Sequence, residues 1–294
     1  MTRRNQGLLL FAVSGYFVIA GIILLQLNGR EWVLDTLSGF GHFFLLGLGG
    51  AIVANSTGAG GGIVFIPAFS ALGLSPSQAL STSIMIQCFG MTAGTISWYI
   101  SFRSRAYIYQ RYRKFLLKGV LTAALFSIIG AVSSQLLFRS AITISMLSLF
   151  SGLSILFGLT LLFSNRYTGR YNYPKTDIAL SDYLLVAPVC FAGGVITSVI
   201  SIGVGEILLI LLFLRRYPLH ISIFAAVFVS AITVIACAPY QILVEQSVVW
   251  EIVAFAAPAA VIGGVLGRYF AHFLGANRIK IFCAIWILVT GVAI

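Results

Sequence analysis

Long apolar segments recur along this chain of 294 residues, and they limit the folds that it can adopt. Only 9% of the residues are charged, whereas a soluble domain carries about 25%. The segments are longer than the ~10 residues of a membrane β-strand and do not alternate between apolar and polar residues. Helices that cross about 30 Å of hydrocarbon suit such segments. The sequence therefore predicts an all-α polytopic membrane protein.

Two of the apolar segments are interrupted by glycine-rich breaks. The first break reads NSTGAGGG at 55–62, between apolar arms at about 41–54 and 63–72, neither of which is expected to reach ~20 residues. The second reads SIGVGE at 201–206, between arms at about 183–199 and 207–214. Unpaired backbone in hydrocarbon costs several kcal/mol per group, so such a break must be buried in protein or line a cavity. Each break is therefore a candidate binding site.

The first break has features that favour a negatively charged ligand. Gly58, Gly60, Gly61 and Gly62 allow positive φ angles and close approach of a ligand to the backbone. A helix that starts near Ile63 would direct free N–H groups and the positive end of its dipole into the break. We expect the amide ends of both interrupted helices to meet inside the bilayer, beside a solvent-reachable hollow that holds an anion.

The same order of segments occurs in both halves of the chain. Three full spans follow each interrupted element, at about 79–102, 115–138 and 142–163 in the first half and at about 221–244, 249–270 and 279–294 in the second. Internal repeats of this kind are typical of transporters. We expect four parts: an N-terminal helix and external loop at 1–40, a first repeat at 41–163, a cytoplasmic linker at 164–182 and a second repeat at 183–294.

The distribution of Lys and Arg predicts the orientation, because cytoplasmic loops are enriched in these residues. If each interrupted element returns to its own side, all of the 18 basic residues except Arg30 and Arg139 lie in the cytoplasm, including those of the loop at 103–118. If each element crossed once, that loop would lie outside. We therefore expect seven spans, two re-entrant helical hairpins and inverted repeats in a bacterial inner membrane, with a cytoplasmic N-terminus and an external C-terminus.

The N-terminal apolar run at 7–27 follows Arg3 and Arg4, as in a signal peptide. It is longer than the 7–15 residues or so of a signal peptide's apolar region, and no small-residue cleavage site follows it. We therefore expect a retained first helix. The net charge is +11, and the basic residues lie between apolar segments. This distribution reflects membrane topology, so no nucleic-acid partner is expected.

The chain resembles the sulfite exporter TauE/SafE family, also called the toluene-sulfonate uptake permease family. The resemblance depends on the sequence GAGGG at 58–62, on Pro67, Pro76 and Ala79, on the Thr-Ser pair at 82–83, and on a second glycine motif at 203–205. It implies a duplicated helical permease for sulfur-containing or organic anions such as sulfite or sulfonates. The second half departs from the family pattern at Glu206, where glycine is frequent, and has no proline that matches Pro67.

Polar side chains in and beside the breaks are the candidate substrate-binding groups. Together with the break glycines they are Asn55, Ser56, Thr57, Gly58, Gly60, Gly61, Gly62, Thr82, Ser83, Gln87, Ser198, Ser201, Gly203, Gly205 and Ser230. Gln87 lies one helical turn after Ser83, and Ser230 matches Ser83 when Ala79 is aligned with Ala226. The alternative is that these side chains cap helix ends or bond carbonyls of their own helices.

Glu206 is the acidic residue that falls within an apolar segment, and ionisable residues inside a membrane are candidates for function. One interpretation is that it complements a helix dipole. The other is that it couples a proton to the anion, because a protonated carboxyl group would donate to a sulfonate that the carboxylate repels.

The histidines, His42, His220 and His272, lie at the ends of separate segments and are expected at the membrane interface. The tryptophans, Trp32, Trp98, Trp250 and Trp286, suit an aromatic belt.

These features together predict a secondary transporter for a small anion, which binds between the two breaks and crosses by alternating access. An anion channel shares the breaks but would conduct downhill without coupling. A membrane-embedded enzyme is disfavoured, because no nucleophile-base set or pair of carboxylates can be assembled at membrane depth. No metal site or cofactor is expected.

Overall fold

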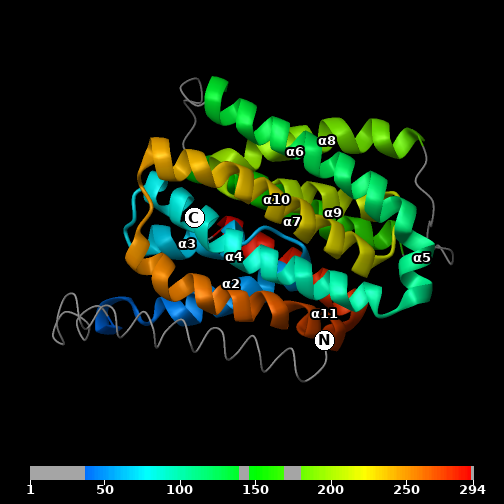
Figure 1. Cartoon of the computed structure of the whole chain (residues 1–294), viewed down its shortest axis with the longest axis horizontal. Coiled ribbons are helices and arrows are strands. Elements are labelled where there is room, and N and C mark those ends of the chain that lie inside the picture. Colours follow the sequence, from blue (N-terminus) through cyan, green and yellow to red (C-terminus); the bar gives the residue numbers. More distant parts are fainter. Residues whose placement is uncertain (1–36, 139–145, 169–179, 293–294) are drawn as a thin grey trace.

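The structure is a computed structural model that describes residues 37–138, 146–168 and 180–292 (Figure 1). These residues form helices joined by short turns, and no strand occurs among them. The predicted N-terminal helix, the turn at Arg139 and most of the linker at 164–182 lie outside the described residues. The all-α prediction is confirmed.

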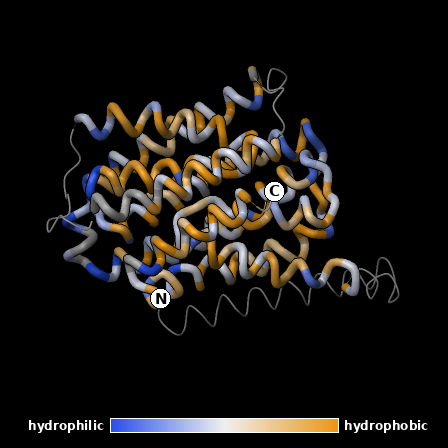
Figure 2. Tube along the Cα trace, turned by 180° about the vertical axis from the view of Figure 1, so that it is seen from behind, coloured by the Kyte–Doolittle hydropathy of each residue, from blue (hydrophilic) through white to orange (hydrophobic). Residues whose placement is uncertain are grey.

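Six helices of the described residues are long and apolar enough to cross a membrane, and the chain is an integral membrane protein. They are Leu37–Thr57, Pro76–Arg103, Gln110–Leu137, Ser181–Ile200, Leu219–Glu245 and Trp250–Gly275. Hydrophobic residues run along the helices, and hydrophilic residues gather towards the ends of the bundle (Figure 2). That distribution is what a bilayer requires of a helical bundle.

The helices run in the following order along the chain. The first half contains α2 (Phe43–Thr57), α3 (Gly62–Ala71), α4 (Pro76–Arg103), α5 (Ala106–Lys114), α6 (Val120–Ser133) and α7 (Met146–Thr168), with π-helical turns at Phe115–Gly119 and Ser134–Phe138. The second half contains α8 (Leu180–Ile200), α9 (Val204–Leu214), α10 (Leu219–Tyr240), a π-helical turn at Gln241–Glu245, and α11 (Trp250–Val292). α11 changes direction at Gly275, where φ is 73° and ψ is 169°.

Each break is the tip of a helical hairpin. The rings of Phe43, at the start of α2, and Phe69, near the end of α3, are 6.1 Å apart, so α3 returns alongside α2. At the base of the second hairpin, Arg215 Nε lies 2.6 Å from Asp182 Oδ1. The Tyr217 hydroxyl donates to the other carboxylate oxygen of Asp182 at 2.9 Å. In both elements the chain therefore reverses at its glycine break.

Two predictions about local structure are wrong. The arm before the first break is not short, because the helix that ends at Thr57 runs for 21 residues from Leu37. The reason in α2 is that the polar residues 55–57 stay helical up to Gly58, whose φ of 80° ends the helix. The basic loop predicted at 103–118 instead contains α5, a helix with Tyr112 buried on one side and Arg113 exposed on the other.

The two halves interlock, because each hairpin packs on a helix of the other half. α2 lies along α11, and α8 lies along α6. Small residues allow the backbones to approach, as is usual between membrane helices. A Cβ atom on Gly47 would collide with the Ala256 carbonyl, and one on Gly194 would collide with the Ser127 carbonyl. Both breaks are buried within this packing.

Candidate functional site

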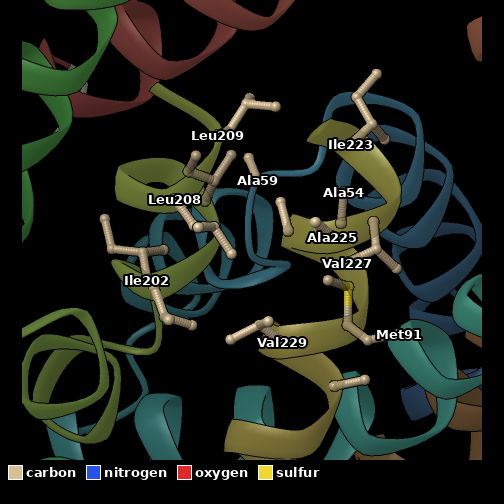
Figure 3. Close-up of a cluster of buried hydrophobic side chains, with 14 of the residues drawn as sticks. Ala54, Ala59, Met91, Ile202, Leu208, Leu209, Ile223, Ala225, Val227 and Val229 are labelled. Atoms are coloured by element: carbon tan, nitrogen blue, oxygen red, sulfur yellow. The ribbon is translucent and has the colours of Figure 1, made fainter. Parts of the chain in front are cut away.

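The two glycine breaks are in direct contact. A Cβ atom on Gly205 would lie 2.6 Å from the Gly58 carbonyl oxygen and 3.5 Å from the Gly60 nitrogen. Buried apolar side chains of α9 and α10 lie on either side of Ala59 (Figure 3). The first break therefore occupies the space between α9 and α10, and glycine at 205 is what permits the approach. The predicted meeting of the breaks is confirmed.

Glu206 connects the two breaks through backbone amides. Its Oε1 atom accepts from the Gly60 N–H and its Oε2 atom accepts from the Gly203 N–H, both at 2.8 Å. The side chain is 1% exposed, and no Lys or Arg of the described chain forms an ion pair with it. A carboxylate placed at two helix N-termini is stabilised by their N–H groups and dipoles. The break amides thus already bond a carboxyl group that belongs to the protein.

Gln87 on α4 connects the breaks a second time. Its Oε1 atom accepts from the Gly61 N–H at 2.8 Å, and its Nε2 atom donates to Ser201 Oγ at 2.6 Å and to Ser83 Oγ at 3.0 Å. The two hydroxyl oxygens are 2.9 Å apart. Ser201 has a φ of 64°, a strained angle for a residue other than glycine that the surrounding contacts must maintain. Ser83, Gln87 and Ser201, predicted from separate segments, therefore form one buried network.

The prediction of a solvent-reachable hollow is wrong for this conformation. The space beside Gly61 and Gln87, among α2, α4 and α11, is a thin void without room for a water molecule. The amides of Gly60, Gly61 and Gly203 are bonded to protein side chains instead of being free. The reason is that Glu206 and Gln87 reach into the breaks and satisfy the amides, as burial in a membrane demands. The site is occluded.

Several of the predicted polar residues bond their own helices. The side chains of Asn55, Ser56, Thr57 and Ser198 each donate to a carbonyl oxygen three or four residues earlier, at distances of 2.9, 2.9, 2.8 and 2.7 Å. Thr57 Oγ1 also accepts from the Ala59 N–H at 3.2 Å. This is the geometry of helix-end satisfaction. All four residues are buried next to the breaks.

Ser230 and Thr82, both predicted as site residues, lie in different surroundings. The buried Ser230 hydroxyl has no hydrogen-bond partner and lies 2.6 Å from the position of a Cβ atom on Gly205. It is therefore a spare donor at the contact between the breaks. Thr82 Oγ1 instead accepts from the Val249 N–H at 3.0 Å, next to the start of α11. Its contacts join it to α11 and not to the network of Ser83 and Gln87.

Sequence reasoning missed Thr197 as part of the second break. Its hydroxyl accepts from the Val204 N–H at 3.0 Å and donates to the Gly193 carbonyl at 2.8 Å. Thr197 thus satisfies the first amide of α9 from the end of α8. The position of a Thr shortly before a glycine break, as at Thr57, was the signal that could have identified it.

Two of the histidines, which come from separate segments, lie together. The rings of His220 and His272 are stacked, with centroids 4.8 Å apart and an interplanar angle of 3°. Trp98, expected in an aromatic belt, is fully buried against both rings, at 5.8 and 5.3 Å. Tertiary packing of α4, α10 and α11 brings these residues together. In the described parts of the chain, no three His, Cys, Asp or Glu side chains gather as a metal site.

Comparison with known protein families gives one clear result. The family model described as "Sulfite exporter TauE/SafE" matches residues 43–294, which include both breaks and every helix described above. Comparisons with curated proteins and with solved structures gave no significant match. Since the match spans most of the sequence, the chain belongs to the sulfite exporter TauE/SafE family of membrane transporters.

Proposed function

We propose that the protein is a secondary transporter for a small sulfur-containing or organic anion, such as sulfite or a sulfonate, which binds where the two breaks meet. The observation that carries the proposal is the Glu206 carboxylate, held at 2.8 Å by one amide from each break. Sulfite and sulfonates present oxygens to N–H donors as a carboxylate does. The same amides therefore suit the cargo once the Glu206 side chain leaves them.

Protonation of Glu206 is the step that releases the amides. A neutral carboxyl group accepts hydrogen bonds more weakly than a carboxylate and can itself donate one. The entering anion takes the Gly60 and Gly203 N–H groups, while the Ser230 hydroxyl supplies a further donor. Because the carboxylate and the cargo compete for these donors, an anion and a proton bind together. This favours coupled movement of both across the membrane.

The closed packing around the breaks favours a carrier over a channel. A carrier passes through an occluded conformation; both breaks are buried, and the void beside Gly61 and Gln87 has no room for water. In our proposal both hairpins are re-entrant within two inverted repeats, and movement of one half against the other exposes the site to each side in turn. The basic end around α5 faces the cytoplasm of a bacterial cell, in accord with the enrichment of Lys and Arg there.

Counterflow exchange tests the proposal. The purified full chain is reconstituted into liposomes loaded with unlabelled sulfoacetate or sulfite, and uptake of the labelled anion is followed with and without the internal anion. A carrier accumulates label transiently above equilibrium when the internal anion is present. Uptake equal to that of protein-free liposomes would overturn transport of these anions, and uptake without any stimulation from the internal anion would support the channel instead.

A further inference from the structure

A buried cation lies outside the contact between the breaks. Arg268 on α11 is 7% exposed. No other Lys or Arg side chain that the structure describes is buried. Its Nε atom donates to Ser97 Oγ at 3.0 Å, and its guanidinium carbon lies 4.1 Å from the centre of the Tyr269 ring. The Nη2 atom is buried and has no hydrogen-bond partner. A guanidinium in this state retains unused capacity to donate.

The guanidinium group also lacks a countercharge within the described chain. None of the described carboxylates forms an ion pair with it; these belong to Asp182, Glu206, Glu245 and Glu251. Glu251, on the same helix, is exposed and about 25 Å away along the helix axis. A buried charge without a partner is strongly unfavourable, and charged residues at membrane depth normally pair. The position of Arg268 is therefore one that a bound anion would stabilise.

Two imidazole rings and an indole ring pack beside the Arg268 backbone. His220 Nδ1 is buried and has no hydrogen-bond partner. The His220 ring is stacked on His272, whose Nδ1 atom lies 2.8 Å from the Arg268 carbonyl oxygen. Trp98 covers both imidazoles. We name these four residues, Trp98, His220, Arg268 and His272, the Arg268 cluster.

The Arg268 cluster lies between the first break and the basic end of the bundle. Trp98 Nε1 donates to the Asn55 carbonyl at 3.0 Å, one turn before Gly58 ends α2. A Cβ atom on Gly267 would lie 2.8 Å from the Asn55 Cβ atom, so α11 contacts the same turn. Beyond Trp98, α4 continues to Arg103 and leads into α5 (Figure 1). An anion entering from the α5 end would meet the cluster before it meets the breaks.

We propose that Arg268 and His220 form a second anion-binding site, which receives a small oxyanion on its way between the α5 end and the breaks. The proposal rests on the proposed transport function, from which it takes sulfite and sulfonates as the ligand class. The planar guanidinium group binds two oxygens of such an anion side by side. The imidazole N–H group donates to a further oxygen. The anion supplies the countercharge that Arg268 lacks.

Equilibrium binding of labelled sulfoacetate to the purified full chain tests the proposal. We expect two binding sites per chain, and we expect Arg268→Gln to weaken one of them by about tenfold or more while leaving the other unchanged. Arg268→Lys keeps the charge but not the planar fork. Its affinity for sulfoacetate at this site should lie between those of the native protein and Arg268→Gln. The matched control is Arg278→Gln, which removes an exposed arginine from the same helix.

A second measurement uses the native protein and does not depend on the folding of an Arg268 variant. Binding at the cluster should change the fluorescence of Trp98 in a saturable manner, and the change should vanish in Trp98→Phe. Unaltered binding in Arg268→Gln, or an equal fluorescence change in Trp98→Phe, would overturn the second site without affecting counterflow. Absence of both binding and counterflow in the native protein would instead overturn the transport proposal and, with it, the second site.

Discussion

The Gly60 amide nitrogen lies 2.8 Å from Oε1 of Glu206, a residue 146 positions further along the chain. Through this contact the second half of the protein completes the hydrogen bonding of the first half. The same carboxylate satisfies Gly203 in its own half. The side chain that closes the site is thus shared by the two breaks, and in the proposed mechanism its charge decides whether their amides are available.

Replacing Glu206 with Gln should separate anion binding from proton coupling. The neutral amide resembles the protonated side chain and competes less with an anion, so sulfoacetate should bind more tightly at neutral pH, on the order of tenfold. Transport by the variant should no longer depend on pH. Dissociation constants and initial uptake rates between pH 5 and 8 provide the measurement. Glu251→Gln, at an exposed position, is the control, and an unchanged pH profile in Glu206→Gln would exclude a coupling role.

Adding a methyl group at Gly205 should impair transport. The new Cβ atom would lie 2.6 Å from both the Gly58 carbonyl oxygen and Ser230 Oγ, so the breaks would have to move apart. Since displacements of about 1 Å can cost 10²-fold in rate, we expect counterflow to fall by tenfold or more. Gly49→Ala is the matched control, because a Cβ atom there meets nothing within 4 Å. Equal losses in both variants would contradict the steric explanation.

Removing the Gln87 amide should destabilise the protein. Gln87→Leu leaves the buried Gly61 N–H without its acceptor and Ser201 Oγ without one donor. A buried polar group that loses its partner costs about 1–3 kcal/mol in the free energy of unfolding. Unfolding curves in detergent, compared with those of Gln110→Leu at an exposed position, measure the difference. Identical curves for the two variants would show that the network contributes nothing to stability.

Tyr217 should make stability sensitive to alkaline pH. Burial, followed by the hydrogen bond to Asp182, raises the pKa of Tyr217 above its usual value near 10. The folded state therefore keeps the proton more firmly than the unfolded state, so this contribution is full below pH 10 and is lost as pH rises above it. Tyr217→Phe should flatten the fall in thermal stability above pH 10. Tyr107→Phe, 72% exposed, should leave the fall unchanged.

The contact between the two breaks was predictable because a glycine-rich interruption of an apolar segment has few structural solutions. The side chains that contact the breaks were harder to predict. Ser83 and Gln87 lie on one face of α4, as their spacing indicated, but Thr82 is turned by one residue and contacts Val249 instead. Spacing along a helix defines a face, and only packing decides which neighbour that face meets.

The Arg268 cluster shows the other limit of sequence reasoning. Arg268 falls within the span predicted at 249–270, yet the distribution of Lys and Arg predicts a cytoplasmic position for it. His220 and His272 belong to different helices, α10 and α11, and nothing local indicates that their rings stack. Long-range packing of this kind has no periodicity that a single sequence could reveal.

The packing of α2 along α11 has a consequence for biosynthesis. A ribosome delivers the N-terminal hairpin early, whereas the helix that covers it emerges last. Until then Asn55 and the backbone around Gly58 lack the cover that hydrocarbon demands. Nascent chains that stop before Trp250 should therefore be recognised as immature and degraded.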